Sequence, residues 1–484
     1  MLFSQRRQLH RAVAEWYEGH HGDDLTAWLP VLAYHWRKAA EDPVPDRAAL
    51  LKAIDYYEQA GNRAAAAFVN DEAIHFFQEP IALLGQLPAE EELQRRELRL
   101  QLALGTAAVA AKSYAAPEVQ VAYGRARDLC AKVGDHAQMF RAMRGMWQYH
   151  SGQGDTAEAS RIGQDLIELA TLSGESALLL EANRMLGNNA YWTGDFGAAR
   201  RFMEQAVAPY RPGEHAGLVA QFGQDPDLAN RGILAWALCF LGYPDTALSH
   251  IRRATARADA MEHPFTRVFA YGAAMWAHKF LWEMAGTERW ADATIALAAE
   301  RGFPYLGVAG KVVRGWARLR RGEAAGLTEV EETVRGWRGS GATIGLSLFL
   351  VVLAESYLFA GRIDDAEAAL NDHILSQRSV AERWLEAEVY RLRGEVALAR
   401  GALSDADTSF RTAWRIAGEQ ANRLAHLRIA MALTRMAGQH KPASDGPGLL
   451  RATYNAFDDG SGVAVVMDAK RAIEAWDQAQ EAAS

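Results

Sequence analysis

A period of 40 residues runs through the middle of this 484-residue chain. Trp236, Trp276 and Trp316 follow one another at this spacing, and Pro264 and Pro304 keep the same step. A fixed step of this size indicates a stack of similar structural units, because one unit of this length cannot bury its own apolar face. The period therefore predicts an array of repeats, and such arrays usually bind other macromolecules.

Within a period, small residues stand where a pair of antiparallel helices needs them. In the clearest unit, Leu186-Gly187 forms the close-approach pair of the first helix, and Gly194-Asp195 forms the turn. Ala199, Met203 and Ala206 then line one face of the second helix, at spacings of four and three. This pattern is typical of tetratricopeptide repeats, although their usual unit of about 34 residues is shorter.

The turn glycine recurs along the chain, at Gly154, Gly194, Gly242, Gly322, Gly361 and Gly401. The gap of 80 residues between Gly242 and Gly322 corresponds to two units, so we expect a further helix pair between Pro264 and Gly302 from the spacing alone. Pro80 interrupts an earlier helical stretch, which it should kink or end.

The step of 48 residues between Gly194 and Gly242 contains an insertion, residues 211–230, which is rich in Gly, Pro and polar residues. Loops that interrupt a regular array are often functional, and many others are connectors. We therefore keep two interpretations of the insertion: a loop that closes over a ligand, and a simple connection.

The composition favours helices, because good helix formers dominate and long alternations of β-branched residues are absent. The predicted fold is all-α: a right-handed superhelical solenoid of tetratricopeptide-like helix–turn–helix repeats of about 40 residues. We expect an N-terminal helical collar over residues 1–90, the repeat solenoid over residues 91–440, and C-terminal capping helices over residues 441–484.

Charge and cysteine content limit the classes of partner. The formal net charge is −8 and no block of Lys or Arg stands out, which argues against a nucleic-acid partner. Cys130 and Cys239 are expected to be reduced, buried thiols. The chain shows neither a signal peptide nor an apolar run long enough for a membrane helix, so we expect a cytoplasmic protein without membrane contact.

No motif for catalysis, cofactor binding or metal binding is present. Gly310-Lys311 is followed by Val312 and lacks the earlier glycine of a phosphate-binding loop. His20-His21 and Asp23-Asp24 lack the spacing of metal ligands. We therefore expect no catalytic residue, no cofactor and no metal, and hence a protein that is not an enzyme.

The tryptophan period also predicts a binding surface. The first helix of each repeat usually lines the concave face of such an array, and aromatic and Arg side chains most often anchor partners there. The predicted concave strip comprises Asn188, Trp192, Trp236, Phe240, Trp276, Phe280, Trp316, Arg320, Glu355, Phe359 and Arg391. The alternative is that the tryptophans pack between neighbouring helices and fill the core.

Several short motifs resemble one known family. They include residues 6–15, Leu32-Ala33-Tyr34-His35-Trp36, residues 52–61, Phe222-Gly223-Gln224-Asp225-Pro226, Gly302-Phe303-Pro304, Arg314-Gly315-Trp316-Ala317 and residues 382–388. As a set they are similar to the tetratricopeptide region of bacterial class III adenylate/guanylate cyclases with a STAND-type ATPase. The resemblance covers roughly residues 5–458. It implies a repeat tail that binds a partner and regulates cyclase and ATPase domains, both of which this chain lacks.

The leading functional prediction is a protein–protein interaction scaffold, or a sensory and regulatory repeat region, that docks a protein or peptide partner on its concave face. The resemblance adds a contact with a cyclase or ATPase module. Two alternatives remain: the regulatory tail of a cyclase or STAND ATPase, and a small-molecule sensor closed by the insertion.

Overall fold

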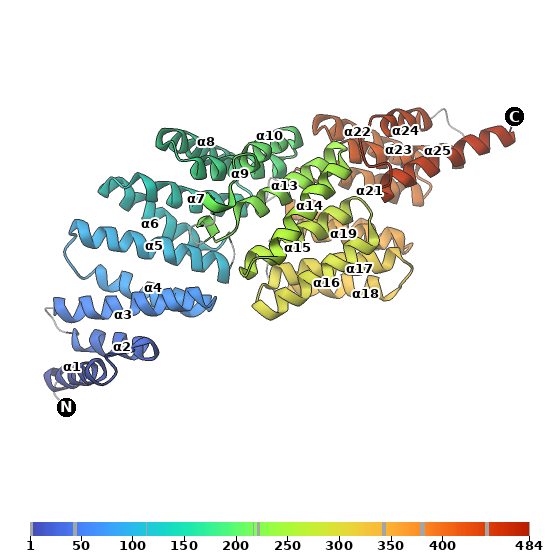
Figure 1. The fold of residues 1–484 in the computed structure, drawn as a ribbon. Helices are drawn as coiled ribbons and strands as arrows, with labels where there is room; N and C mark the ends of the chain where they lie inside the picture. The colour runs from blue at the N-terminus through green and yellow to red at the C-terminus, as the bar shows by residue number, and fades with distance from the viewer. Residues whose placement is uncertain are drawn as a thin grey trace. The chain divides into compact units, whose positions relative to one another are not determined.

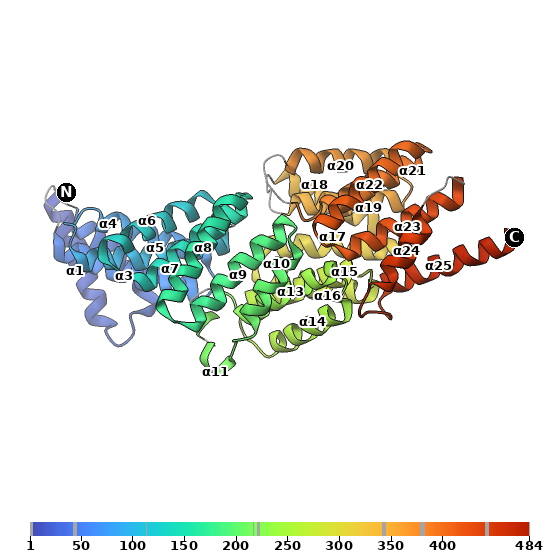
Figure 2. The ribbon, with the colours of Figure 1, turned by 90° about the horizontal axis from the view of Figure 1, so that it is seen from above.

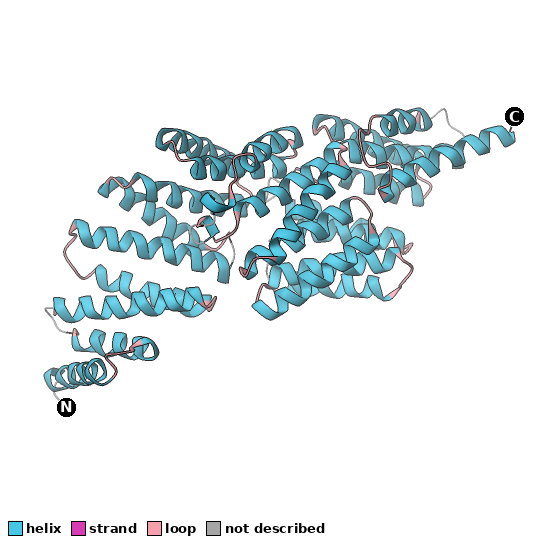
Figure 3. Ribbon diagram, viewed as in Figure 1, coloured by secondary structure: helices cyan, strands magenta, loops and turns pink. Residues whose placement is uncertain are grey.

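The protein is described here from a computed structural model that covers residues 3–41, 46–112, 114–215, 217–219, 223–340, 345–377, 383–440 and 445–483. The chain forms two compact units, and within each unit consecutive helices pack against one another (Figure 1, Figure 2). All regular structure in the described ranges is helical, with 24 α-helices and one short 3-10 helix (Figure 3). The prediction of an all-α helical-repeat fold is confirmed.

The chain divides into two compact units, Met1–Ser173 and Gly174–Ser484. The first unit contains α1 Phe3–His20, η1 Thr26–Trp28, α2 Leu29–Ala39, α3 Arg47–Ala66, α4 Asn70–Leu84, α5 Glu91–Ala111, α6 Pro117–Val133, α7 His136–Gln153 and α8 Thr156–Ser173. The predicted divisions after residues 90 and 440 stay predictions.

Aromatic side chains of the first unit fit against glycines on neighbouring helices. A Cβ atom on Gly105 of α5 would lie 2.7 Å from the Tyr123 ring, and one on Gly145 of α7 would lie 2.2 Å from it. Tyr123 of α6 therefore packs where both neighbouring backbones come close. The helix α4 continues past Pro80 to Leu84, so of the two predicted outcomes, a kink or a helix end, the helix end is wrong. Burial of Pro80 and Leu84 stabilises the last turn.

The second unit contains α9 Ser176–Thr193, α10 Phe196–Val207, α11 Pro212–His215, α13 Pro226–Leu241, α14 Pro244–Asp259, α15 Pro264–Phe280, α16 Met284–Arg301, α17 Pro304–Arg320, α18 Ala325–Gly339, α19 Leu346–Phe359, α20 Ile363–Gln377, α21 Glu386–Ala399, α22 Leu403–Glu419, α23 Arg423–His440, α24 Gly446–Asn455 and α25 Ala464–Ala483. The pair that was predicted from spacing alone is α15 and α16.

The turn between α15 and α16 shows why no turn glycine marked this helix pair in the sequence. Gly242 and Gly322 adopt left-handed backbone conformations with φ of 87° and 92°. Trp282 stands midway between them, 40 residues from each, and also has a positive φ, 61°. A bulky side chain rarely takes this conformation. The repeat is therefore kept at the α15–α16 turn, but a strained tryptophan occupies the glycine position.

The C-terminal part of the second unit contacts α14 and the end of α15, which lie much earlier in the chain. The backbone N–H of Val465, in α25, donates to the carbonyl oxygen of Leu281 at 3.2 Å. The carboxylate of Asp459 accepts from the backbone N–H groups of Asp245 and Thr246, both at 3.0 Å. These contacts cap the N-terminus of α14 from a residue more than 200 positions away. They join the C-terminal residues of this unit to α14 and to the residue after α15.

The insertion is only partly a loop. Residues 212–215 form α11, and α13 already begins at Pro226, so the prediction of a loop through Asn230 is wrong there. Asp225 is fully buried, caps α13 through Leu228 N–H at 3.1 Å, and accepts from Tyr210 at 3.0 Å. Phe222, which belongs to the motif at residues 222–226, lies outside the described residues.

Candidate functional site

The predicted concave strip is largely covered. Trp316 is completely buried and Trp276 is 5% exposed, so these rings fill the core as the packing alternative proposed. The Trp236 indole N–H donates to the carbonyl oxygen of Ala273 at 2.9 Å. Buried positions also include Phe240, Phe280, Glu355 and Arg391; half-buried positions are Asn188, Trp192, Trp236 and Arg320; Phe359 is exposed. A partner-binding role for these residues stays a prediction.

The structure nevertheless brings many of these side chains together around Trp384, which lies just before α21. The Trp384 ring lies 5.3 Å from the Trp192 ring and 6.1 Å from both the Phe240 and Phe280 rings, measured between centroids. Phe240 and Phe280 are 4.9 Å apart. The result is an aromatic cluster that joins α9, α13 and α15 to the residues before α21.

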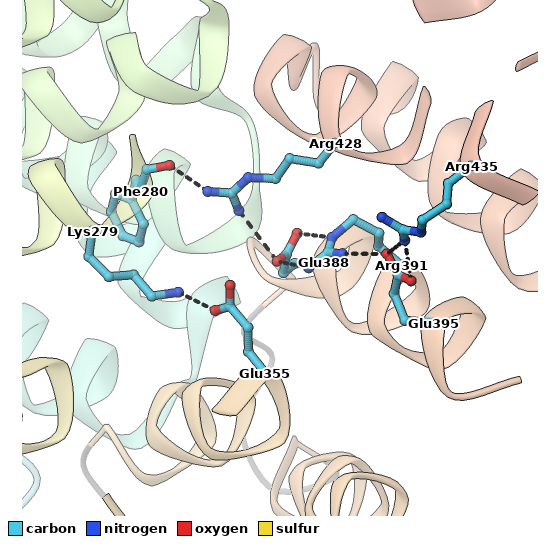
Figure 4. Close-up of polar contacts among 8 residues, drawn as sticks. All are labelled: Lys279, Phe280, Glu355, Glu388, Arg391, Glu395, Arg428 and Arg435. Atoms are coloured by element: carbon cyan, nitrogen blue, oxygen red, sulfur yellow. Dashed lines mark hydrogen bonds and ion pairs between the residues drawn. The ribbon is translucent and has the colours of Figure 1, made fainter. Parts of the chain in front are cut away.

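Charged side chains lie beside this cluster, inside the second unit (Figure 4). The Lys279 ammonium of α15 donates to the Glu355 carboxylate of α19 at 2.8 Å. The same ammonium lies 4.8 Å from the centroid of the Trp316 ring, over its face. Lys279 thus connects the predicted residues Trp316 and Glu355, and it was absent from the predicted strip.

A second group of charges is centred on Glu388 of α21. Arg391 binds this carboxylate through two hydrogen bonds of 2.7 and 3.0 Å, and it also reaches Glu395 at 3.2 Å. Arg428 of α23 donates to Glu388 at the longer distance of 3.3 Å. Its other terminal nitrogen donates to the carbonyl oxygen of Phe280, a contact that spans 148 residues (Figure 4).

We call Lys279, Glu355, Glu388, Arg391 and Arg428 the interior charge cluster. None of the five side chains is more than 13% exposed. Three of them are basic and two are acidic, so the cluster carries one excess positive charge. Glu395 and Arg435 form a more exposed pair at its edge, with a contact of 2.7 Å.

Burial and charge act in opposite directions on this cluster. Burial alone would raise the pKa of the Glu388 carboxyl, but Arg391 and Arg428 hold that pKa below its usual range. Glu355 has the same balance: burial opposes its ionised form, and Lys279 restores it and lowers the pKa. Burial lowers the pKa of the Arg428 guanidinium despite the nearby carboxylates, whereas Glu388 holds the pKa of the equally buried Arg391 above its usual value.

A small cavity adjoins the cluster. It has a volume of about 20 Å³, enough for one water-sized group, and Arg428, Glu388 and Trp384 line it together with Phe240 and Leu348. The Nε–H of Arg428 and the indole N–H of Trp384 are buried and have no hydrogen-bond partner. Buried donors without a protein partner are unusual in folded proteins, where such groups normally donate to protein or to ordered water.

Sequence reasoning missed Lys279, Glu388, Arg428, Trp384 and Trp282. The position of Trp282 was available, because it falls at the midpoint of the 80-residue gap between turn glycines. Trp384 and Glu388 belong to a motif that supported the family resemblance, but no spacing rule connected them to Lys279. Arg428 carried no signal, since its partners Phe280 and Glu388 are 148 and 40 residues away.

Sequence comparisons show a distant relative but no family. No protein-family model matches the chain. The chain is 23% identical over 422 residues to an uncharacterised protein of Rhizobium meliloti (strain 1021), a match that covers 84% of this chain. The chain spans 39% of the length of that relative.

Among solved structures, the fold is similar to that of a Rap protein complexed with competence and sporulation factor, with a TM-score of 0.53 and 14% identity. This likeness covers 76% of this chain and 98% of the Rap protein. A STAND protein with a tetratricopeptide repeat sensor from Pyrococcus horikoshii has a TM-score of 0.35 and 12% identity, covering 87% of this chain and 72% of that one. The structural neighbours are helical-repeat proteins, and the link to cyclases stays a prediction.

Among the described helices, none combines the length and the apolar character that crossing a bilayer requires. In the same described ranges, no three His, Cys, Asp or Glu side chains are grouped so that they could hold a metal ion. Cys130 and Cys239 are free and buried, as predicted.

Proposed function

We propose that the second unit is an interaction scaffold that binds a protein or peptide partner on the concave face of its helical array, beside the interior charge cluster. The supporting observation is the cluster itself. Burying an ion pair costs several kcal/mol per ion, and a well-packed apolar replacement is often as stable or more stable. Five charges that are kept in an otherwise apolar interior, next to two unpaired donors, therefore favour recognition over stability as their role.

The fold is compatible with this role. Helical-repeat arrays usually act as non-catalytic binding scaffolds, and the Rap protein of similar fold was solved in a complex with competence and sporulation factor. A regulatory or sensory repeat region of a signalling protein, in contact with a cyclase or ATPase module, is the finer form of the proposal. The longer relative from Rhizobium meliloti leaves room for such additional domains.

The test is selection from a random peptide library displayed on phage, with the full chain as bait. The Lys279→Met/Glu355→Met double variant removes both charges of one buried pair together, so it should remain folded. We expect selected peptides to bind the parent chain and to lose about tenfold or more in affinity for the double variant. The control is Arg161→Gln, which removes the exposed ion pair between Arg161 and Glu158 on α8. This variant should bind the peptides as the parent does.

Circular dichroism and melting temperature establish that all three chains are folded. Equal binding of the selected peptides to the parent and to a folded double variant would place the binding surface elsewhere and contradict the proposal. Failure to select any peptide that binds the parent in solution would also count against it.

A second candidate function, small-molecule sensing, is supported by Asn230 near the start of α13. Asn230 is completely buried, and neither the nitrogen nor the oxygen of its amide has a hydrogen-bond partner. Nearby in sequence, Gln224 is also buried with an unpaired amide nitrogen. A thermal-shift screen of polar metabolites tests this candidate, since a ligand that binds only the folded state raises the melting temperature. An Asn230→Leu variant that keeps the shift would contradict it.

A further inference from the structure

The cavity beside Arg428 is enclosed by helices from both ends of the second unit. Phe240 comes from α13, Leu348 from α19, Glu388 from α21 and Arg428 from α23, while Trp384 lies just before α21. Most of its wall is aromatic or aliphatic. Its polar lining consists of Lys279, Glu388, Asn422 and Arg428, together with the indole of Trp384.

The unmet hydrogen-bonding capacity of this wall has one sign. Among the described residues that line the cavity, the unpaired buried polar atoms are the Arg428 Nε–H and the Trp384 indole N–H, and both are donors. Arg428 is 6% exposed and Trp384 is 2% exposed, so bulk water does not satisfy them. The missing group must be a hydrogen-bond acceptor, which an oxygen atom with two lone pairs can provide.

The charge balance favours an anionic acceptor. The interior charge cluster has three basic and two acidic members, so one added negative charge would neutralise it. The pKa of Arg428 is lowered by burial, which shows that its charge is incompletely compensated by Glu388 and Glu355. A carboxylate oxygen meets these requirements, because the cavity of about 20 Å³ accepts one oxygen-sized group and the rest of the ligand can lie outside it.

The network also contains a contact that such an anion could replace. Glu388 is held by Arg391 through bonds of 2.7 and 3.0 Å, whereas its bond from Arg428 is 3.3 Å long. If Arg428 turned towards an incoming carboxylate, Glu388 would keep its two-bond partner. The exchange would leave no buried charge without a counter-ion, which is the condition for a low cost.

We infer that this cavity is a carboxylate-recognition subsite, in which Arg428 and Trp384 donate to a carboxylate oxygen that enters between Phe240 and Leu348, while the rest of the ligand lies outside the cavity. The inference rests on the proposed function, because it names the chemical group that a partner presents to the concave face. The carboxylate can come from an acidic side chain of a peptide, from a peptide C-terminus, or from a free aliphatic acid.

The experiment compares acids with their neutral counterparts by isothermal titration calorimetry on the full chain. One pair is sodium hexanoate and hexanamide. The peptide arms are an end-blocked tetrapeptide with a central glutamate flanked by leucine and phenylalanine, its glutamine counterpart, and the glutamine peptide with a free C-terminal acid. We expect at least one acid to bind about tenfold more tightly than its neutral counterpart. The arm that shows the difference identifies the source of the carboxylate.

Two variants tie the effect to the cavity. Arg428→Gln should abolish the preference for the acid. Trp384→Phe, which keeps an aromatic side chain but replaces the indole and its N–H by a smaller phenyl ring, should reduce it about threefold. Trp384→Phe keeps the test decisive if Arg428→Gln fails to fold. Arg161→Gln on α8 is the matched control and should keep the full preference.

Acid and neutral probes that bind the parent within twofold of each other would overturn the inference, as would a preference that survives in both folded variants. The proposed function fails differently. Phage-selected peptides that bind equally well as acids and as amides would leave the scaffold proposal standing and remove the subsite. A clear preference for hexanoate, with no peptide bound, would support the subsite and contradict the scaffold.

Discussion

The two units build their interiors from the same helix pairs but fill them differently. In the first unit, Tyr123 packs against glycines of two neighbouring helices, and ion pairs such as Arg125–Glu97 stay in contact with solvent. In the second unit, the interior charge cluster lies among buried aromatic rings. Among the described residues the first unit buries a single charged side chain, Arg144, whereas the second unit groups five buried charges, so this cluster calls for a role of its own.

The largest expected difference comes from removing one charge in each unit. Arg391→Met leaves Glu388 and Glu395 with incomplete partners inside the second unit, and we expect a loss of about 3–5 kcal/mol in the free energy of unfolding. Arg125→Met in the first unit removes a pair that is 42% and 17% exposed, and should cost less than about 1 kcal/mol. Denaturant titration followed by hydrogen exchange resolves the two units. Similar losses would remove the distinction between them.

A glycine substitution tests whether close packing is the main requirement of the first unit. Gly145→Ala places a Cβ atom 2.2 Å from the Tyr123 ring and should cost about 1–3 kcal/mol through overpacking. Gly124→Ala is the matched control, because its nearest neighbour is the sulfur of Met146 at 3.9 Å. The control should be neutral or slightly stabilising. A Gly145→Ala chain that melts like the parent would show that α6 and α7 can separate without cost.

A smaller effect is expected at the turns, where both units use left-handed residues. Ala421, between α22 and α23, has φ of 52°, so Ala421→Gly should stabilise the second unit by about 1 kcal/mol. Gly134, after α6, has φ of 68° and open space around it, so Gly134→Ala should destabilise the first unit by a similar amount. Thermal melts measure both changes. Equal signs for the two substitutions would contradict this explanation.

The smallest expected effect is a dependence on pH that separates His250 from the interior charge cluster. Burial, with Arg231 and Arg253, lowers the pKa of His250 from 6.5 to about 4. The unfolded chain therefore binds a proton that the folded chain refuses, and stability falls as the pH drops from 6.5 towards 4. Glu355 and Glu388, whose pKa values are lowered, contribute stability above pH 4.5 and lose it only below that value.

The check is the pH dependence of the melting temperature for the parent and for His250→Asn. Between pH 6.5 and 4.5 the variant should lose less stability than the parent. A decline should remain in both chains, because burial also lowers the pKa values of His263, His278 and His426. A parallel decline of the two chains above pH 4.5 would exclude His250 as the cause.

The sequence predicted the features that repeat and missed those that join distant parts. The 40-residue step placed the α15–α16 pair correctly, because spacing alone defines where neighbouring helices stack. It also placed Trp316 at a regular position but could not decide between groove and core, since both environments accept an aromatic ring. The contact between Lys279 and Glu355 spans 76 residues, and only a folded backbone shows which basic side chain meets which carboxylate.

The contacts that α23 and the residues before α25 make with α15 and α14 have a consequence for how the chain folds. In an ordinary array each hairpin contacts its neighbours, so opening can start at an end and proceed unit by unit. The bond from Arg428 to Phe280 and the cap that Asp459 provides to α14 instead couple segments 148 and 214 residues apart. The second unit should therefore unfold in one cooperative transition and fold slowly, because these closing contacts form only after a long loop has been brought together.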